Sequence, residues 1–212
     1  DHVVLATGIS PRKPAIPGIE SDKVATYPDI IEGRKVAGKS VAIIGAGGIG
    51  FDVGEFLTHA HDERSESERF NSEWGIDPTY ASRGGLKPAV DEKAPRKVYL
   101  LQRKESKVGD GLAKTTGWIR RTLLKKRGVT MIPGVSYERI DEAGLHISVG
   151  GEAKTLPVDT IVVCAGQESR RELKAPLEAA GIPVTLIGGA DVAAELDAKR
   201  AIDQGTRVAA AL

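Results

Sequence analysis

Six residues, Gly45-Ala46-Gly47-Gly48-Ile49-Gly50, carry the spacing G-x-G-x-x-G between two apolar runs. In such a turn, Gly45 allows a sharp bend, Gly47 lets the backbone approach a pyrophosphate, and Gly50 lets helix and strand pack closely. The free N–H groups at the start of the following helix, together with its dipole, favour an anion. The spacing therefore predicts a site that binds a dinucleotide through its pyrophosphate.

The residues on either side of the turn supply the context that this motif requires. Residues 40–44 form a β-branched apolar run of the kind found in buried parallel strands, and residues 51–59 have helical spacing. Strand, turn and helix thus follow one another in the required order. Without that order, the same glycines would indicate nothing more than a glycine-rich turn.

The type of dinucleotide is indicated by the next apolar run, residues 98–101, which ends in Gln102, Arg103 and Lys104. An NAD site usually has an acid here, bonded to the ribose hydroxyls. A neutral amide and two cations instead suit the 2′-phosphate of NADPH. We therefore assign cofactor binding to all three residues and favour NADPH, although Glu105 leaves NAD open and the cations could be a solvated strand end.

The remaining pattern predicts an α/β protein. Residues 38–168 are expected to form a Rossmann-like NAD(P)-binding domain with a central parallel sheet, helices and an antiparallel β-meander. Residues 61–96 are polar and broken by glycine and proline, so they are interpreted as an irregular insertion. Residues 1–37 and 169–212 are expected to be segments of a second domain into which the first is inserted, with a helix over residues 192–211.

Composition limits the classes of function. Among 212 residues the net charge is +1, which gives no broad field for nucleic acid or an anionic membrane, so neither is expected as a partner. Cys164 is the single cysteine, and it is predicted to be a buried strand residue in a cytoplasmic protein. His59 and His61 lack a further ligand cluster, so no metal is expected.

The chain opens DHVVLATG, with neither Met nor any lead-in before an apolar strand. This beginning indicates a fragment of a longer polypeptide. Four motifs then follow in order along the chain, ATG at residues 6–8, the glycine turn, CAGQE at 164–168 and IGGAD at 187–191. In this order they resemble the flavoprotein disulfide-reductase fold, which has two dinucleotide-binding domains.

Longer strings narrow the resemblance, among them LQRKESKVGDGLAKTTGW and IGGADVAAELDAKRAIDQGTR. They are similar to the C-terminal region of the bacterial NADPH-dependent 2,4-dienoyl-CoA reductase family. The resemblance implies a complete NADPH domain and a partial FAD domain, made of residues 1–37 and 169–212. It also implies that FMN, an iron–sulfur cluster and an N-terminal TIM barrel belong to the full-length protein alone. In that family a hydride passes from NADPH to FAD, and electrons reach FMN for reduction of a dienoyl-CoA.

The resemblance implies further cofactor-binding residues and no catalytic residue, because the catalytic acids of that family lie in the barrel. Asp191 would accept a ribitol hydroxyl of FAD, and the helix after it would direct its N-terminus at the flavin ring. Two alternatives stay open, an amine-dehydrogenase-type flavoprotein and a nucleotide-binding module without redox chemistry. The residues assigned to cofactors beyond the first two turns are Thr7, Gly8, Ala165, Gly166, Gln167, Gly189, Ala190 and Asp191.

Overall fold

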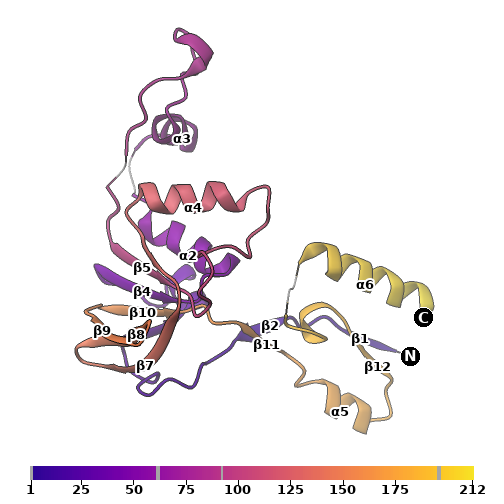
Figure 1. Ribbon diagram of the computed structural model, residues 1–212. Helices are drawn as coiled ribbons and strands as arrows, with labels where there is room; N and C mark the ends of the chain where they lie inside the picture. The colour runs from indigo at the N-terminus through magenta and orange to yellow at the C-terminus, as the bar shows by residue number, and fades with distance from the viewer. Residues whose placement is uncertain (1, 61–62, 92, 195–196) are drawn as a thin grey trace. The chain divides into compact units, whose positions relative to one another are not determined.

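The computed structural model describes residues 2–60, 63–91, 93–194 and 197–212 (Figure 1). The chain separates into two compact units. The larger unit is Ala15–Cys164, and the smaller one combines Asp1–Pro14 with Ala165–Leu212.

A parallel sheet of five strands forms the centre of the larger unit. Such a sheet, with helices joining parallel strands, confirms the expected α/β Rossmann-like class. The strands lie in the order β3 (Val24–Thr26), β10 (Thr160–Val163), β4 (Ser40–Ile44), β5 (Lys97–Leu101) and β6 (Thr130–Ile132).

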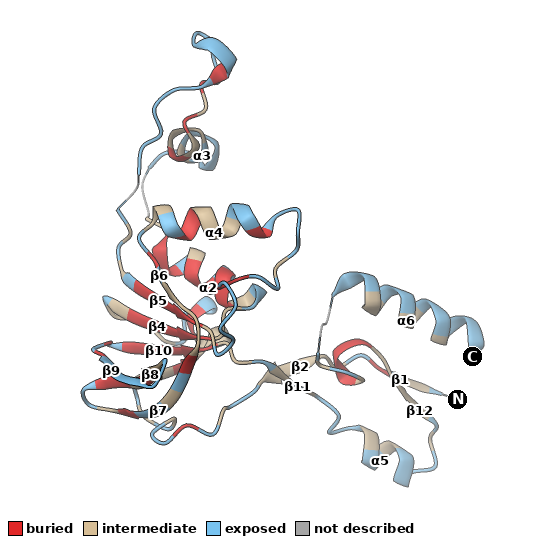
Figure 2. Ribbon diagram, viewed as in Figure 1, coloured by how far each residue is buried: buried red, intermediate tan, exposed pale blue. Residues whose placement is uncertain are grey.

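The core lies between this sheet and two helices, α2 (Gly48–Thr58) and α4 (Gly117–Lys126). Val41 and Ile43 of β4 pack in one cluster with Phe51 of α2. Full burial of an aliphatic or aromatic side chain of this size contributes about 1.5–3 kcal/mol. Figure 2 shows the same concentration of buried residues in the central strands and in α2.

The expected β-meander is confirmed. It consists of β7 (Val135–Asp141), β8 (Gly144–Val149) and β9 (Glu152–Leu156), which pair antiparallel in sequence order. Gly144 has a φ of +125°, a conformation that L side chains rarely adopt, and it closes the turn between β7 and β8.

Residues 15–37 belong to the larger unit, in contrast to the expected boundary at residue 38. The reason is β3, which pairs in parallel with β10 and extends the central sheet. Helix α1 (Tyr27–Ile31) follows directly, capped by the side chain of Thr26, and its Ile30 is buried in the core. The second boundary lies after Cys164 rather than after Glu168.

The insertion at residues 61–96 is more regular than expected. It contains helix α3 (Glu66–Trp74) and the short 3₁₀ helix η1 (Arg83–Gly85). Ser65 begins α3 through a reciprocal capping box with Glu68, and Gly75 ends it in the left-handed conformation.

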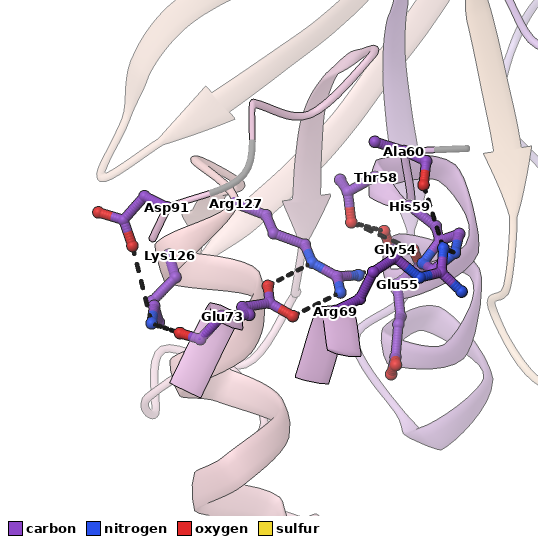
Figure 3. A network of polar contacts seen from close by, with 10 residues as sticks. All are labelled: Gly54, Glu55, Thr58, His59, Ala60, Arg69, Glu73, Asp91, Lys126 and Arg127. Atoms are coloured by element: carbon purple, nitrogen blue, oxygen red, sulfur yellow. Dashed lines mark hydrogen bonds and ion pairs between the residues drawn. The ribbon is translucent and has the colours of Figure 1, made fainter. Parts of the chain in front are cut away.

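A buried ion pair fixes this insertion to α4 (Figure 3). Glu73 of α3 accepts two parallel hydrogen bonds from Arg127, at 2.9 Å from Nε and 3.0 Å from Nη2. Both side chains are almost completely buried, with 6% and 7% of their surface exposed. Lys126 adds a hydrogen bond to the carbonyl oxygen of Glu73 and lies 5.4 Å from the centre of the Trp74 ring.

The smaller unit contains two short strand pairs and three helical segments. Strand β1 (Val3–Leu5) pairs in parallel with β12 (Val184–Leu186), and β2 (Ile9–Pro11) pairs antiparallel with β11 (Gln167–Ser169). The helical segments are α5 (Lys174–Ala179), the 3₁₀ helix η2 (Gly188–Ala190) and α6 (Ala198–Ala211). None of the helices formed by the described residues is long and apolar enough to cross a bilayer.

Helix α6 begins six residues later than expected. Its N-cap is Asp197, whose carboxylate accepts a hydrogen bond from the backbone N–H of Arg200 at 2.7 Å. The expected start at residue 192 is wrong, because residues 192–194 are not helical and the helix begins only after the cap that Asp197 supplies.

Candidate nucleotide-binding site

The glycine turn has the geometry that its spacing predicts. Gly45 has a φ of +110°, and its backbone N–H donates to the carbonyl oxygen of Leu101 at 3.0 Å. A Cβ at Gly50 would overlap the carbonyl oxygen of Gly45, so only glycine permits this approach of helix to strand. The turn is therefore built around Gly45 and Gly50 as packing positions.

The other two glycines of the turn face open space. A Cβ added at Gly47 or Gly48 would meet nothing within 4 Å. Gly47 is the N-cap of α2, makes no side-chain cap, and is followed by a first turn without acidic residues. Free backbone N–H groups at the positive end of an eleven-residue helix suit a pyrophosphate, which makes this turn a fitting cradle for a dinucleotide.

The basic turn, residues 102–104, lies beside the glycine turn. Ile44 and Leu101 are register partners in the adjacent parallel strands β4 and β5, so the segments that follow them leave the same edge of the sheet. Arg103 and Lys104 are exposed, and within the described residues neither side chain has a hydrogen bond or ion pair. Two cations are thus available beside the cradle, as a 2′-phosphate requires.

Tyr137 of β7 is a neighbour of this basic turn. Burial raises the pKa of the Tyr137 hydroxyl, and the positive charge of Arg103 partly opposes the rise. Tyr137 therefore stays neutral at physiological pH and does not neutralise Arg103.

Gln102 differs from its two neighbours. Its amide nitrogen donates to the carbonyl oxygens of Lys104 at 3.0 Å and Ser106 at 2.7 Å, and its amide oxygen accepts from the backbone N–H of Gly109 at 3.4 Å. The Gln102 side chain thus makes contacts within the loop, and its assignment to the cofactor stays a prediction. Sequence spacing could not reveal this, because the loop path depends on where Gly109 returns to the helices.

Substitution by alanine is expected to affect stability at one kind of glycine and dinucleotide affinity at the other. Gly50→Ala is expected to lower the free energy of unfolding by about 1–3 kcal/mol or more, because the methyl group overlaps backbone. Gly47→Ala is expected to keep the stability and lose dinucleotide affinity, because its methyl group stands in the open cradle. Urea unfolding and calorimetric titration of both variants measure the two quantities, with Gly205→Ala in helix α6, where a Cβ meets only an ordinary contact, as a control for affinity. A Gly47→Ala variant with unchanged affinity would contradict the cradle.

In the smaller unit, the expected cofactor residues Thr7 and Gly8 follow strand β1 and form hydrogen bonds with the backbone of Arg170. Thr7 Oγ1 donates to the carbonyl oxygen of Arg170 at 2.6 Å, and the carbonyl oxygen of Gly8 accepts from the Arg170 N–H at 3.1 Å. Arg12, which the sequence did not indicate, donates through its guanidinium to the carbonyl oxygen of Ala165. Gly166 takes a φ of +99° beside it, and Gln167 begins β11.

A cavity of about 380 Å³ lies at the η2 turn of the smaller unit. Gly189 lines it, while Ala190 is fully buried and Asp191 is absent from its lining. Asp191 instead accepts a hydrogen bond from the Gln204 amide at 2.7 Å, and the same amide accepts from Gly188 N–H at 2.7 Å. The residue at the helix start that lines the cavity is Asp197, so Asp191 is not the cap of α6.

Cys164 directly follows strand β10, so it is not the strand residue that was expected, and it is partly buried against the core. Burial raises the pKa of its thiol to about 12, so the thiol stays protonated at neutral pH. Among the described residues, no group of three His, Cys, Asp or Glu side chains could hold a metal. His61 and Asp62, which the sequence places near His59, lie outside the described residues.

A Rossmann-like domain with an open glycine turn, followed by a second glycine-rich turn, fits the class of pyridine-nucleotide oxidoreductases. The family model for pyridine nucleotide-disulphide oxidoreductases matches residues 1–201, and the chain belongs to this family. Members of the family use FAD together with NAD(P)H.

The chain is also similar to a curated relative in sequence and to solved structures in fold. The chain is 27% identical over 198 residues to a metal reductase of Desulforamulus reducens, covering 90% of this chain and 28% of that protein. A 2-naphthoyl-CoA reductase has the same fold over 95% of this chain and 25% of its own, with a TM-score of 0.72 and 22% identity. A 6-hydroxypseudooxynicotine amine oxidase from Pseudomonas geniculata gives a TM-score of 0.72 at 20% identity, over 98% and 28% of the two chains. The chain thus spans little more than a quarter of the relatives that it matches.

Proposed function

We propose that this chain is the NADPH-binding part of a larger flavin oxidoreductase. The observation that carries the proposal is the open glycine cradle beside two exposed cations that have no carboxylate partner among the residues that the structure describes. The cradle fits a pyrophosphate, and Arg103 and Lys104 fit the 2′-phosphate that distinguishes NADPH from NADH. The role of this chain is to bind and orient the dinucleotide.

We further propose that the smaller unit holds part of an FAD site around the cavity at η2. When both cofactors are bound, NADPH supplies a hydride and FAD accepts it. Gly188 and Gly189 would let the flavin approach the backbone, and the N-terminus of α6 would face an anionic part of it. Asp191 is then a support of this turn, held by Gln204, rather than its main ligand.

The full-length activity that we propose is reduction of 2,4-dienoyl-CoA in unsaturated fatty-acid β-oxidation. Two observations support this activity. They are the sequence resemblance and the fold that the chain shares with a 2-naphthoyl-CoA reductase. FMN, an iron–sulfur cluster and a TIM barrel of the same cytoplasmic polypeptide belong to this proposal. The alternative is an amine-oxidising flavoprotein, which the fold shared with the amine oxidase favours.

Calorimetric titration of this chain with NADPH and with NADH tests the proposal. NADPH is expected to bind about tenfold or more tightly than NADH, as one charge-assisted hydrogen bond would produce. Equal affinities would refute the assignment of NADPH. Reduction of the full-length flavoprotein by an amine and not by NADPH would favour the amine-oxidising alternative.

A further inference from the structure

We propose that Gln102 is a positioning residue that sets the preference for NADPH without touching the cofactor. The inference rests on the proposed function, because it concerns the two cations of the basic turn. Gln102 would act through the backbone that carries Arg103 and Lys104.

The side chain of Gln102 bridges the loop that it begins. Its amide nitrogen reaches two carbonyl oxygens, those of Lys104 and Ser106, and its amide oxygen receives the N–H of Gly109. All three partners are backbone groups of the same loop. An amide is the side chain that can donate twice and accept at once, so this neutral residue matches the loop better than a carboxylate would.

The loop has two fixed ends between which this bridge acts. At its start, the backbone N–H of Gln102 donates to the carbonyl oxygen of Ile132 at 2.9 Å. The backbone N–H of Gly134 donates to the carbonyl oxygen of Lys104 at 3.0 Å. At its return, Gly109 lies so close to the ring of Phe51 that a Cβ would come within 2.6 Å of it. Arg121 also donates to the carbonyl oxygen of Gly109 at 2.7 Å.

The side chains of residues 103–107 are exposed, and this stretch includes both cations. The Gln102 amide and the Gly134 N–H both hold the carbonyl oxygen of Lys104, and the amide alone also reaches Ser106 and Gly109. Two cations bind a phosphate most tightly when their backbone is held in place before binding, because the loop then loses less conformational entropy. Loss of the bridge should therefore lower the affinity for a 2′-phosphate and leave the central sheet nearly unchanged.

A double-mutant cycle separates positioning from folding. Gln102→Met removes both donors and the acceptor at nearly unchanged length and without adding charge. In the parent chain it is expected to lower the ratio of NADH to NADPH dissociation constants by about fivefold or more. In a chain that already carries Arg103→Ala and Lys104→Ala, Gln102→Met is expected to leave that ratio unchanged.

Several outcomes would overturn the inference. They are an unchanged ratio in the parent chain, an equal loss of affinity for both nucleotides, or an effect that persists without the two cations. Gln102→Asn, whose shorter amide cannot span the loop, should repeat the loss of preference, and misfolding of both variants would assign Gln102 a structural role instead. A parent chain without NADPH preference would refute the proposed function, whereas a parent with that preference and an unaffected variant would refute this inference alone.

Discussion

Replacing Arg103 and Lys104 together with alanine is expected to weaken NADPH binding by tenfold to several hundredfold while NADH binding stays nearly constant. Each charge-assisted hydrogen bond to the 2′-phosphate contributes about 1.5–3 kcal/mol, and a factor of ten corresponds to about 1.4 kcal/mol. Both side chains are exposed, and within the described part of the chain neither forms a hydrogen bond or ion pair, so their removal should leave the fold intact. Isothermal calorimetry with the two nucleotides measures the effect.

The matched control removes two positive charges elsewhere. Lys125 lies exposed on α4 and Lys154 lies exposed on β9, so Lys125→Ala with Lys154→Ala changes the net charge equally. This control variant should retain most of the NADPH affinity, because distant exposed charges are screened by salt. If both double variants lose affinity to the same extent, the effect is one of net charge, and the basic turn has no specific role.

The second large effect is expected at the buried pair of Glu73 and Arg127. Glu73→Ala should lower the free energy of unfolding by about 3–5 kcal/mol, because it leaves the guanidinium of Arg127 buried without its carboxylate partner. For a chain of this size, such a loss corresponds to a decrease in Tm of roughly 6–20 °C. Urea unfolding and thermal melting followed by circular dichroism check the two values.

Helices α2 and α4 offer an exposed ion pair for comparison. Asp52 and Arg120 pair across α2 and α4 with 57% and 40% of their side chains exposed, so Asp52→Ala should cost less than about 1 kcal/mol. Replacing the buried pair by Leu at Glu73 and Met at Arg127 should restore much of the stability, since no charge is left buried. If the Glu73→Ala and Asp52→Ala variants have the same Tm, the buried pair stabilises the fold no more than an exposed ion pair does.

The nucleotide turn could be predicted from the sequence because its constraints are local. The positive φ at Gly45 and the close approach at Gly50 both follow from the G-x-G-x-x-G spacing between a strand and a helix. The meander was predictable for the same reason, since its strands are separated by glycine turns within a few residues.

Other features depend on partners that are distant in the sequence, and the sequence did not indicate them. Strand β3 has three residues, too few to show an alternation of apolar and polar side chains. It is defined by its pairing with β10, more than 130 residues later in the sequence. The side-chain direction of Gln102 depends on Gly109 returning to α2. Asp197 could have been found as a helix cap, because an acid directly before a run of helix formers is a local signal.

The position of the insertion has a practical consequence for engineering. It interrupts the crossover between α2 and β5, while the glycine turn and the basic turn follow the paired strands β4 and β5. Because closing a longer loop costs only slightly more entropy, this crossover can accept additional sequence without disturbing the cofactor cradle. The segment around Tyr80, whose surface is 82% exposed, is therefore a suitable place to insert a fluorescent reporter or an affinity tag.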